Sequence, residues 1–195
     1  MKTLLAAAFA LALAAPSLAS AQAPYVGGRV GYGMPFGEIS AGAPQRDVIS
    51  SGVPLQLDAG FKLGPVDGGA YFSYGFAQPD SSCGGSCSAN VIRAGLQGSL
   101  HSEIRPGREV WAGVLAGYER LKLSAGGGGD ASASGWEGGL QAGFDFASST
   151  TGFGPFMSFT IGQFSNITED GTSASVTDKK FHGTFQLGVR GFFKI

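Results

Sequence analysis

The sequence predicts an all-β fold: an eight-stranded antiparallel up-and-down transmembrane β-barrel that follows a cleaved signal peptide. Three observations lead to this prediction. Eight segments alternate apolar and polar residues with the period of two that is typical of a β-strand. The connections between these segments alternate between tight turns and long polar loops. Charged residues make up only 14% of the chain, whereas a soluble surface alone is about 25–35% charged.

The N-terminus has the organisation of a secretory signal peptide. A basic start is followed by an apolar stretch, residues 4–15, which is too short to span a bilayer as a helix. Small residues then allow cleavage after Ala21 or after Ala23. We therefore expect residues 1–23 to form the signal peptide and residues 24–195 to form the barrel. An uncleaved N-terminal membrane anchor is the alternative.

Each of the eight segments places apolar side chains on one face and polar or small side chains on the other. The last segment shows this most clearly, because Phe185, Leu187 and Val189 share a face opposite Gln186 and Arg190. A tilted strand needs roughly 9–11 residues to cross a bilayer, and these segments have that scale. The predicted strands comprise residues 26–32, 53–63, 70–76, 92–101, 110–119, 136–146, 153–162 and 180–195.

The connections differ in length in a regular way. Tight turns are predicted at residues 64–67, 105–108 and 148–151. Long loops rich in Gly, Ser, Asp and Thr are predicted at residues 34–52, 78–89, 124–134 and 165–179. Outer-membrane barrels have short turns on the periplasmic side and longer loops outside. An even number of strands brings both chain ends to the side of the short turns, where the first strand can pair with the last.

Alternation alone does not tell which face points inward, because a soluble lipocalin-like barrel has the same period. An eight-stranded lumen is narrow, and the apolar face is rich in bulky residues such as Phe61, Phe72 and Phe144. We therefore expect the apolar face to contact lipid and the small polar face to line the lumen. Aromatic residues also lie near the proposed rims, as in an interfacial girdle: Tyr25, Tyr32, Trp136, Phe153 and Phe193.

The chain end resembles a known signal. In residues 186–195 the two faces of the strand alternate up to the last residue, and Val189, Gly191, Phe193 and Ile195 share one face. In strand number, loop asymmetry and this ending, the chain resembles the small eight-stranded outer-membrane barrels, such as the OmpA transmembrane domain, OmpX and the opacity-type adhesins. The resemblance implies an outer-membrane location, contact with membrane lipids and lipopolysaccharide, and recognition by the barrel assembly machinery. The family usually ends in Phe, where this chain has Ile195.

Eight charged residues are expected to point into the lumen. Four are basic and four are acidic, so they could pair across the narrow interior, where an unpaired charge is costly. Such pairs would fill the barrel as a plug. A gated ion path or a proton relay is the alternative. The residues are Arg29, Asp58, Lys62, Arg93, Glu119, Glu137, Asp145 and Arg190.

The two cysteines, Cys83 and Cys87, lie in the second long loop. An exported chain with two cysteines normally pairs them, so we expect a disulfide. A metal site is the alternative, but two thiolates without a nearby histidine fall short of the usual four ligands. The sequence therefore predicts no metal and no cofactor.

Catalysis is not expected. Outer-membrane lipid A deacylases are also eight-stranded and have a His-x-Ser-Asn motif near the chain end. The similar segment here, residues 163–166, starts with Gln163 in place of the histidine, so Ser165 would lack an activating base. His101 and His182 both lie on the polar face, where hydrogen bonding in the lumen is the expected role.

These observations favour a structural or interactive role: a compact monomeric barrel that supports the envelope and displays its loops. The net charge is −1, or −2 without Lys2, so a nucleic acid is not an expected partner. A narrow pore for small solutes or hydrophobic molecules is the second hypothesis, because many lumen positions are glycine. An adhesin is the third. The lumen glycines are Gly60, Gly75, Gly95, Gly113, Gly117, Gly139, Gly143, Gly162 and Gly188.

Overall fold

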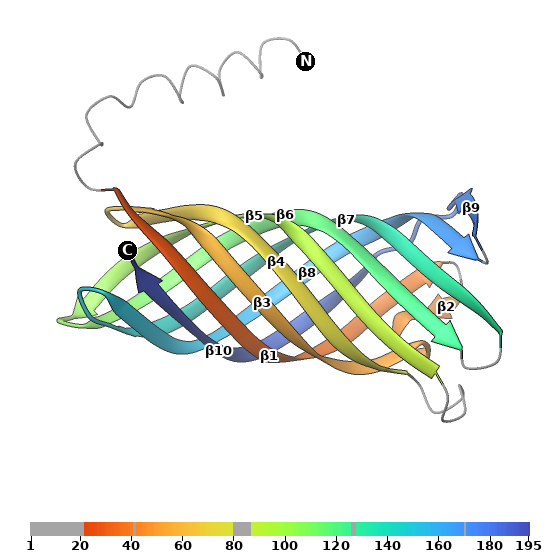
Figure 1. Cartoon of the computed structure of the whole chain (residues 1–195), viewed down its shortest axis with the longest axis horizontal. Helices are drawn as coiled ribbons and strands as arrows, with labels where there is room; N and C mark the ends of the chain where they lie inside the picture. Colours follow the sequence, from red (N-terminus) through yellow and green to blue (C-terminus); the bar gives the residue numbers. More distant parts are fainter. Residues whose placement is uncertain (1–21, 41, 80–86, 126–127, 170) are drawn as a thin grey trace, which may run out of the picture.

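The computed structural model describes residues 22–40, 42–79, 87–125, 128–169 and 171–195. These residues form an eight-stranded antiparallel barrel, as the sequence predicted (Figure 1). The barrel strands are β1 (Gln22–Ser40), β3 (Ile49–Leu63), β4 (Val66–Pro79), β5 (Cys87–Arg105), β6 (Arg108–Ala125), β7 (Gly128–Ala147), β8 (Thr151–Glu169) and β10 (His182–Lys194). The smaller elements are β2 (Ala43–Pro44), the 3-10 helix η1 (Gln45–Asp47) and β9 (Thr172–Ser175). The predicted signal peptide lies outside the described residues, apart from Gln22 and Ala23, which begin β1.

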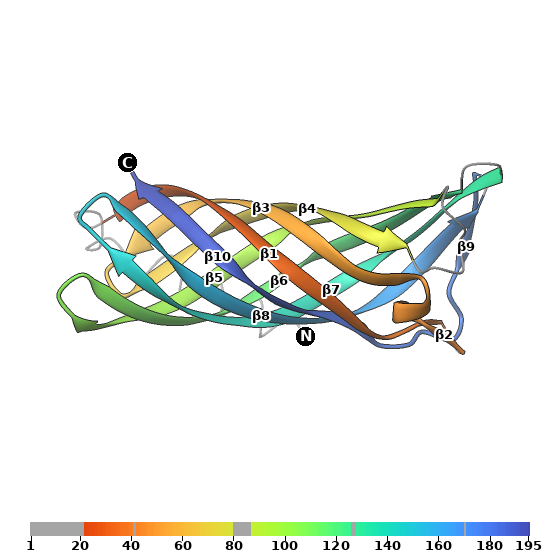
Figure 2. The same cartoon turned by 90° about the horizontal axis from the view of Figure 1, so that it is seen from below.

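The barrel closes between its first and last strands. β1 pairs with β10 from Tyr25–Lys194 to Gly37–His182, and β10 pairs on its other edge with β8. The start of β1 and the end of β10 lie at the end of the barrel that has the tight turns (Figures 1 and 2). Gly64 and Gly107 occupy the left-handed region in two of these turns, with φ of 61° and 75°, which glycine adopts without strain. We call this end the short-turn end and the opposite end the loop end.

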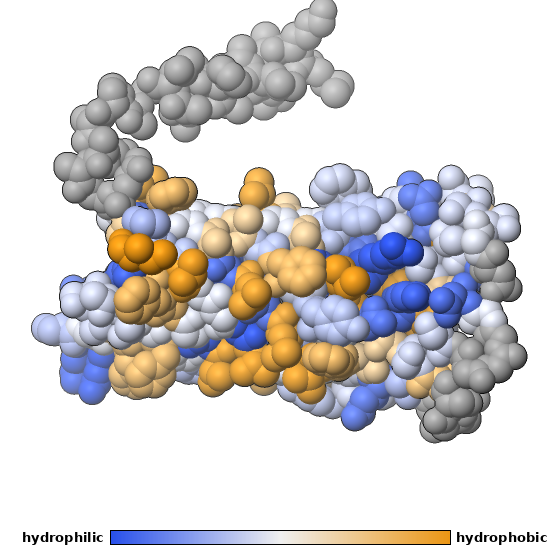
Figure 3. Space-filling view, viewed as in Figure 1, coloured by the Kyte–Doolittle hydropathy of each residue, from blue (hydrophilic) through white to orange (hydrophobic). Residues whose placement is uncertain are grey.

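The apolar face points outward. Leu57, Leu96 and Leu140 are 64–69% exposed, and the middle of the wall is largely orange in Figure 3. Polar and charged residues such as Asp145 and Glu119 are buried inside. This arrangement is the reverse of a soluble barrel, so the lipocalin-like alternative is wrong. One expectation for the girdle is also wrong: Tyr25 lines the lumen, because it shares the face of Arg29 on the same strand.

The strands extend further at the loop end than predicted. β6 and β7 stay paired as far as Ala125 and Gly128, so the predicted loop 124–134 is mostly a hairpin. The predicted loop 34–52 contains β2 and η1, and the loop 165–179 contains β9. Ser, Ala and Thr occupy both faces of these extensions, so the apolar–polar alternation fades while the backbone ladder continues.

No helix in the described ranges is long and apolar enough to cross a membrane.

Candidate functional site

The candidate site is the interior of the barrel, which holds four groups of ion-paired side chains. Every second residue of a strand points inward, so each barrel strand contributes side chains to this interior. All eight charges predicted for the lumen point inward, and the structure gives each of them an oppositely charged partner. We describe the groups by the basic residue at the centre of each.

The Arg29 group joins four strands. The Arg29 guanidinium donates from Nε to Asp58 Oδ2 at 2.7 Å, from Nη1 to Gln141 Oε1 at 2.6 Å and from Nη2 to Gln97 Oε1 at 3.0 Å. The second oxygen of Asp58 accepts from Gln97 Nε2 at 2.8 Å and from Gln56 Nε2 at 2.7 Å. Glutamine amides thus bind the N–H groups of Arg29 and the oxygen of Asp58 that the ion pair does not use, as a buried charge requires.

The Arg93 group contains two carboxylates. Arg93 lies 2.5 Å from Glu119 Oε2 and 3.2 Å from Glu137 Oε2. The second oxygen of Glu119 is 2.9 Å from His182 Nε2, and Glu137 Oε1 accepts from Tyr71 Oη at 3.2 Å. Glu119, Glu137 and His182 are each at most 6% exposed. Five strands are therefore tied together around one guanidinium.

The Arg190 group combines an ion pair with aromatic stacking. Arg190 donates to both oxygens of Asp145, whose side chain is fully buried. The Arg190 Cζ atom lies 3.5 Å from the centroid of the Trp111 ring and 5.6 Å from that of Phe192. This is the fork geometry and ring contact that arginine makes and lysine cannot reproduce.

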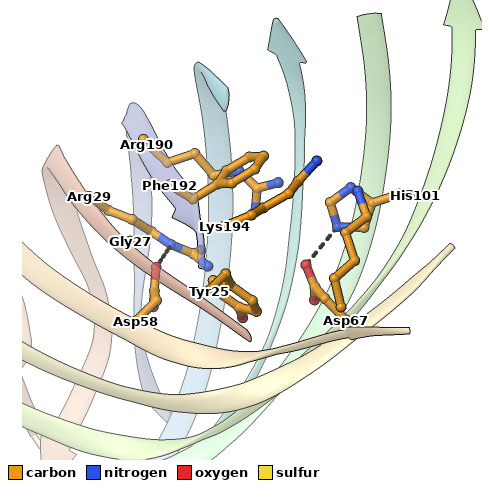
Figure 4. A pocket seen from close by; sticks show the side chains of 11 residues that line it. Tyr25, Gly27, Arg29, Asp58, Asp67, His101, Arg190, Phe192 and Lys194 are labelled. Atoms are coloured by element: carbon orange, nitrogen blue, oxygen red, sulfur yellow. Dashed lines mark hydrogen bonds and ion pairs between the residues drawn. The ribbon is translucent and has the colours of Figure 1, made fainter. Parts of the chain in front are cut away.

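The Lys62 group lies at the mouth of the short-turn end. Lys62 Nζ is 2.8 Å from Glu109 Oε2. His101 joins two carboxylates, with Nδ1 at 3.0 Å from Glu109 Oε2 and Nε2 at 2.7 Å from Asp67 Oδ2, and Figure 4 shows the ring facing Asp67. Both ring nitrogens can donate only as an imidazolium. The group thus combines one lysine, one histidine and two carboxylates at this mouth.

The sequence did not identify every member of these groups. Asp67 falls in the predicted turn 64–67, and Glu109 lies between the predicted turn 105–108 and the strand predicted from residue 110. Their odd positions match those of Tyr71 and Trp111 on the same strands, and this parity could have identified them. The alternation places Gln97 and Gln141 on the lumen face, but it does not identify them as hydrogen-bond partners of Arg29, because the stagger of the strands decides which side chains meet.

Two of the lumen glycines, Gly117 and Gly143, lie against large side chains from other strands. A Cβ at Gly117 would overlap the Tyr71 hydroxyl, and a Cβ at Gly143 would lie 2.6 Å from Trp111 Cζ2. Near the short-turn mouth, the room for water is only about 20 Å³, about that of one ordered water. The space beside Gly117 and Gly143 is therefore filled by aromatic rings from other strands.

An apolar cluster closes the loop end. Phe164 is fully buried, and its ring stacks on His182 with centroids 3.8 Å apart. Helix η1 folds against β1 and β3, and its Gln45 is 1% exposed. The side-chain amide of Gln45 donates to the carbonyls of Phe36 and Gly183. The cluster consists of Ile39, Ile49, Ala89, Val91, Leu121, Ala133 and Phe164.

The wall has a seam between β1 and β3. Their ladder runs from Gln22–Leu63 to Val30–Leu55 and is then restored only at Gly33–Gly52. Pro54 lies in the interrupted stretch and has no N–H to donate. A pocket with about 30 Å³ of room for water opens here and reaches the Arg93 and Thr184 side chains inside.

The remaining predicted positions do not converge on a site. In the C-terminal segment, Val189, Phe193 and Ile195 are at least half exposed on the outer wall, and the Ile195 N–H donates to Pro24 O at 2.8 Å. Cys83 lies outside the described residues, and its disulfide with Cys87, the first residue of β5, stays a prediction. The described part of the chain contains no cluster of three or more potential metal ligands that could hold an ion.

Comparison with known proteins identifies the fold. No family model and no curated protein matches the sequence. Neisserial surface protein A is similar in structure, with a TM-score of 0.60 and 12% identity over 86% of this chain and 95% of that one. The outer membrane protein OprG from Pseudomonas aeruginosa has a TM-score of 0.54 and 10% identity over 90% and 96% of the two chains. The outer membrane protein AlkL has a TM-score of 0.50 and 14% identity over 89% and 90%.

The protein therefore has the fold of the small outer-membrane β-barrels. Its outer wall is apolar, as contact with lipid requires, and its lumen is polar. The shared fold and the apolar wall together indicate the outer-membrane location that the sequence predicted.

Proposed function

We propose that the protein is a closed, non-catalytic barrel that supports the envelope and presents the loop-end sheet to partners outside the cell. The filling of the lumen is the observation that supports this proposal. Four ion-paired groups and the rings of Tyr71, Trp111 and Phe156 occupy the interior, and an apolar cluster covers the loop end.

The energetics of the lumen argue against easy opening. A continuous path would have to separate pairs such as Arg29–Asp58 and Arg93–Glu119, whose side chains are at most 12% exposed. Breaking a buried pair leaves an uncompensated charge and typically costs about 3–5 kcal/mol. Since each basic group joins several strands, these contacts stabilise the barrel as a unit.

The experiment is gene deletion with complementation. We expect the deletion strain to lose resistance to SDS with EDTA, and the wild-type barrel to restore it. A variant with Arg93→Ala should restore it poorly, whereas Lys180→Ala, which changes an exposed loop residue, should act like wild type. Unchanged detergent resistance in the deletion strain would reject the envelope role.

A second candidate function, entry of small hydrophobic molecules, is supported by the seam between β1 and β3. Apolar residues Tyr32, Met34 and Val53 are 41–52% exposed beside it, and the lining of its pocket includes Phe76 of the outer wall and Arg93 of the interior. A molecule dissolved in the outer leaflet could enter there beside Ile49 and Val91 of the apolar cluster.

A cross-link tests this candidate. Gly33 and Gly52 are paired across the seam, so a Gly33→Cys/Gly52→Cys disulfide, made with both natural cysteines replaced by Ser, should close it. The matched control is Gly28→Cys/Leu57→Cys, which joins the same strands where the ladder is intact. If the seam is a portal, only the first cross-link should slow the entry of a fluorescent apolar probe into proteoliposomes. Equal entry with both cross-links would exclude it.

A further inference from the structure

On β6 and β7, toward the loop end, the outer wall changes from apolar and aromatic residues to basic and polar residues. Tyr118 and Trp136 are direct cross-strand partners, and their rings meet edge to face with centroids 5.5 Å apart. Trp136 is 69% exposed on the outside of the barrel. Exposed aromatic pairs of this kind lie at the boundary between hydrocarbon and headgroups. This pair therefore marks the height of the outer interface.

Two basic residues follow immediately on the same outward face. Arg120 is paired with Ser134, and Lys122 with Ser132. A strand rises about 3.4 Å per residue, which puts Arg120 about 7 Å and Lys122 about 14 Å beyond Tyr118 along β6. Strand tilt shortens these distances along the membrane normal. Both side chains therefore lie at the level of lipid headgroups.

Several hydrogen-bond donors on this surface are not used in the described contacts. Ser134 Oγ accepts from Tyr118 Oη at 2.9 Å, and Ser132 Oγ accepts from Arg120 Nη2 at 3.4 Å, so both hydroxyls can still donate outward. The Arg120 guanidinium has five N–H donors. Among the described contacts, its only side-chain hydrogen bond is the one to Ser132.

Lys122 is partly engaged. Its Nζ lies 3.4 Å from Asp130 Oδ2, with the lysine side chain 44% exposed. A hydrogen bond from Ser124, together with Lys122, holds the pKa of the Asp130 carboxyl below its usual value. Arg120 is therefore the principal unpaired cation of this surface, and Lys122 is a second one shared with Asp130.

We propose that this surface, the β6–β7 basic patch formed by Tyr118, Arg120, Lys122, Ser132, Ser134 and Trp136, binds the phosphate group of an outer-leaflet glycolipid of the lipid A type. The guanidinium matches a phosphate in charge and in fork geometry, and the serine hydroxyls add donors. The acyl chains would lie against Trp136 and the apolar wall below it, where Leu140 is 64% exposed.

The occupant is a lipid rather than a dissolved anion, because the patch is continuous with the lipid-facing wall. A free phosphate would gain the charge contacts alone, whereas a phosphorylated lipid also gains the apolar contact. The proposal depends on the outer-membrane location and not on the proposed function of the barrel.

The test measures lipid retention by the full refolded chain in detergent micelles. The probes are lipid A with both phosphates, the same lipid without phosphates, and inorganic phosphate. The variant is Arg120→Gln/Lys122→Gln. The matched control is Lys179→Gln/Lys180→Gln, which removes the same charge from exposed loop positions. Unboiled mobility in SDS verifies that each variant is folded.

We expect native mass spectrometry to show lipid A bound to the wild-type and control barrels with at least about tenfold higher affinity than to the patch variant. We also expect loss of that difference with the dephosphorylated lipid. Equal binding by the patch variant would overturn the proposal, as would equal retention of both lipids by the wild-type barrel. Competition by millimolar inorganic phosphate that removes all lipid A would show an anion site instead of a lipid site.

Discussion

At the scale of single residues, the barrel tolerates charge in its interior because each ionised group meets several partners. Arg29 makes three side-chain hydrogen bonds to one carboxylate and two amides, and Arg190 pairs with Asp145 while it stacks on Trp111. Such pairs contribute little net stability compared with apolar packing, but removing one partner is costly. Removing one partner of a lumen ion pair should therefore lower the stability of the barrel by more than the intact pair contributes to it.

Arg93 gives the sharpest case. Arg93→Ala would leave Glu119 and Glu137 buried without their cation, so we expect a loss of about 3–5 kcal/mol in the free energy of unfolding. Arg93→Lys keeps the charge and should lose less. Urea unfolding in micelles, followed by tryptophan fluorescence, measures both. Lys180→Ala is the exposed control, and an Arg93→Ala barrel as stable as this control would contradict the account.

Gly117 tests the packing of the lumen. Gly117→Ala would place a methyl group against the Tyr71 hydroxyl, and such overpacking costs about 1–3 kcal/mol. Tyr71→Phe removes the clashing oxygen and should recover part of this loss in the double variant. The control is Gly138→Ala, whose nearest neighbour is Leu115 O at 3.7 Å. The same unfolding measurement applies, and equal stability of both glycine variants would argue for an open lumen.

The sequence predicted which charges point inward, but not every pairing. Alternation assigned Arg93 and Glu119 to the lumen face, since parity along a strand is local information. It missed Asp67 and Glu109, which lie directly beside tight turns, and it placed Tyr25 in the girdle although its parity matches Arg29. Contacts across the lumen depend on strand stagger, which no single segment encodes.

At the scale of elements, the last strand has two tasks. β10 closes the barrel by pairing with both β1 and β8, and it presents Val189, Phe193 and Ile195 on the outer wall. The second feature is the one that the resemblance links to the barrel assembly machinery. That link stays a prediction.

Substitutions at the chain end test it. We expect Phe193→Ala to lower the amount of folded barrel in the outer-membrane fraction several-fold, and Ile195→Phe to maintain or raise it. Phe181→Ala is a suitable control, because Phe181 is 63% exposed and precedes the strand. Quantitative immunoblots of unboiled samples provide the measurement. A Phe193→Ala barrel that assembles as well as the control would mean that this side chain is not read.

The loop-end elements were the least predictable. Lys122 and Ser132 pair across β6 and β7, although both residues are polar. The sequence there shows no alternation of apolar and polar residues from which a strand could be predicted. Helix η1 was also missed, because its position depends on the space between β1 and β3 and not on its own short sequence. The strand order and the tight turns, in contrast, follow directly from local patterns.

At the scale of the whole molecule, an apolar wall surrounds an interior that holds four ion-paired groups and buried aromatic rings. The two faces of each strand predicted this inverted arrangement, because the apolar residues are too bulky for an eight-stranded lumen. The sequence could not decide whether the lumen is open, because that depends on the stagger of the strands. The stagger, for example, brings the rings of Tyr71 and Trp111 against Gly117 and Gly143 on other strands.

Ion conductance across a planar lipid bilayer tests this closure most directly. Refolded barrels, verified by a mobility shift between unboiled and boiled samples in SDS, are inserted and a voltage is applied. We expect no steady conductance above that of the bare bilayer, because the ion-paired groups and the apolar cluster block the lumen in the proposed closed barrel. Steady ohmic current steps from the wild-type barrel would contradict the closed lumen and favour a pore.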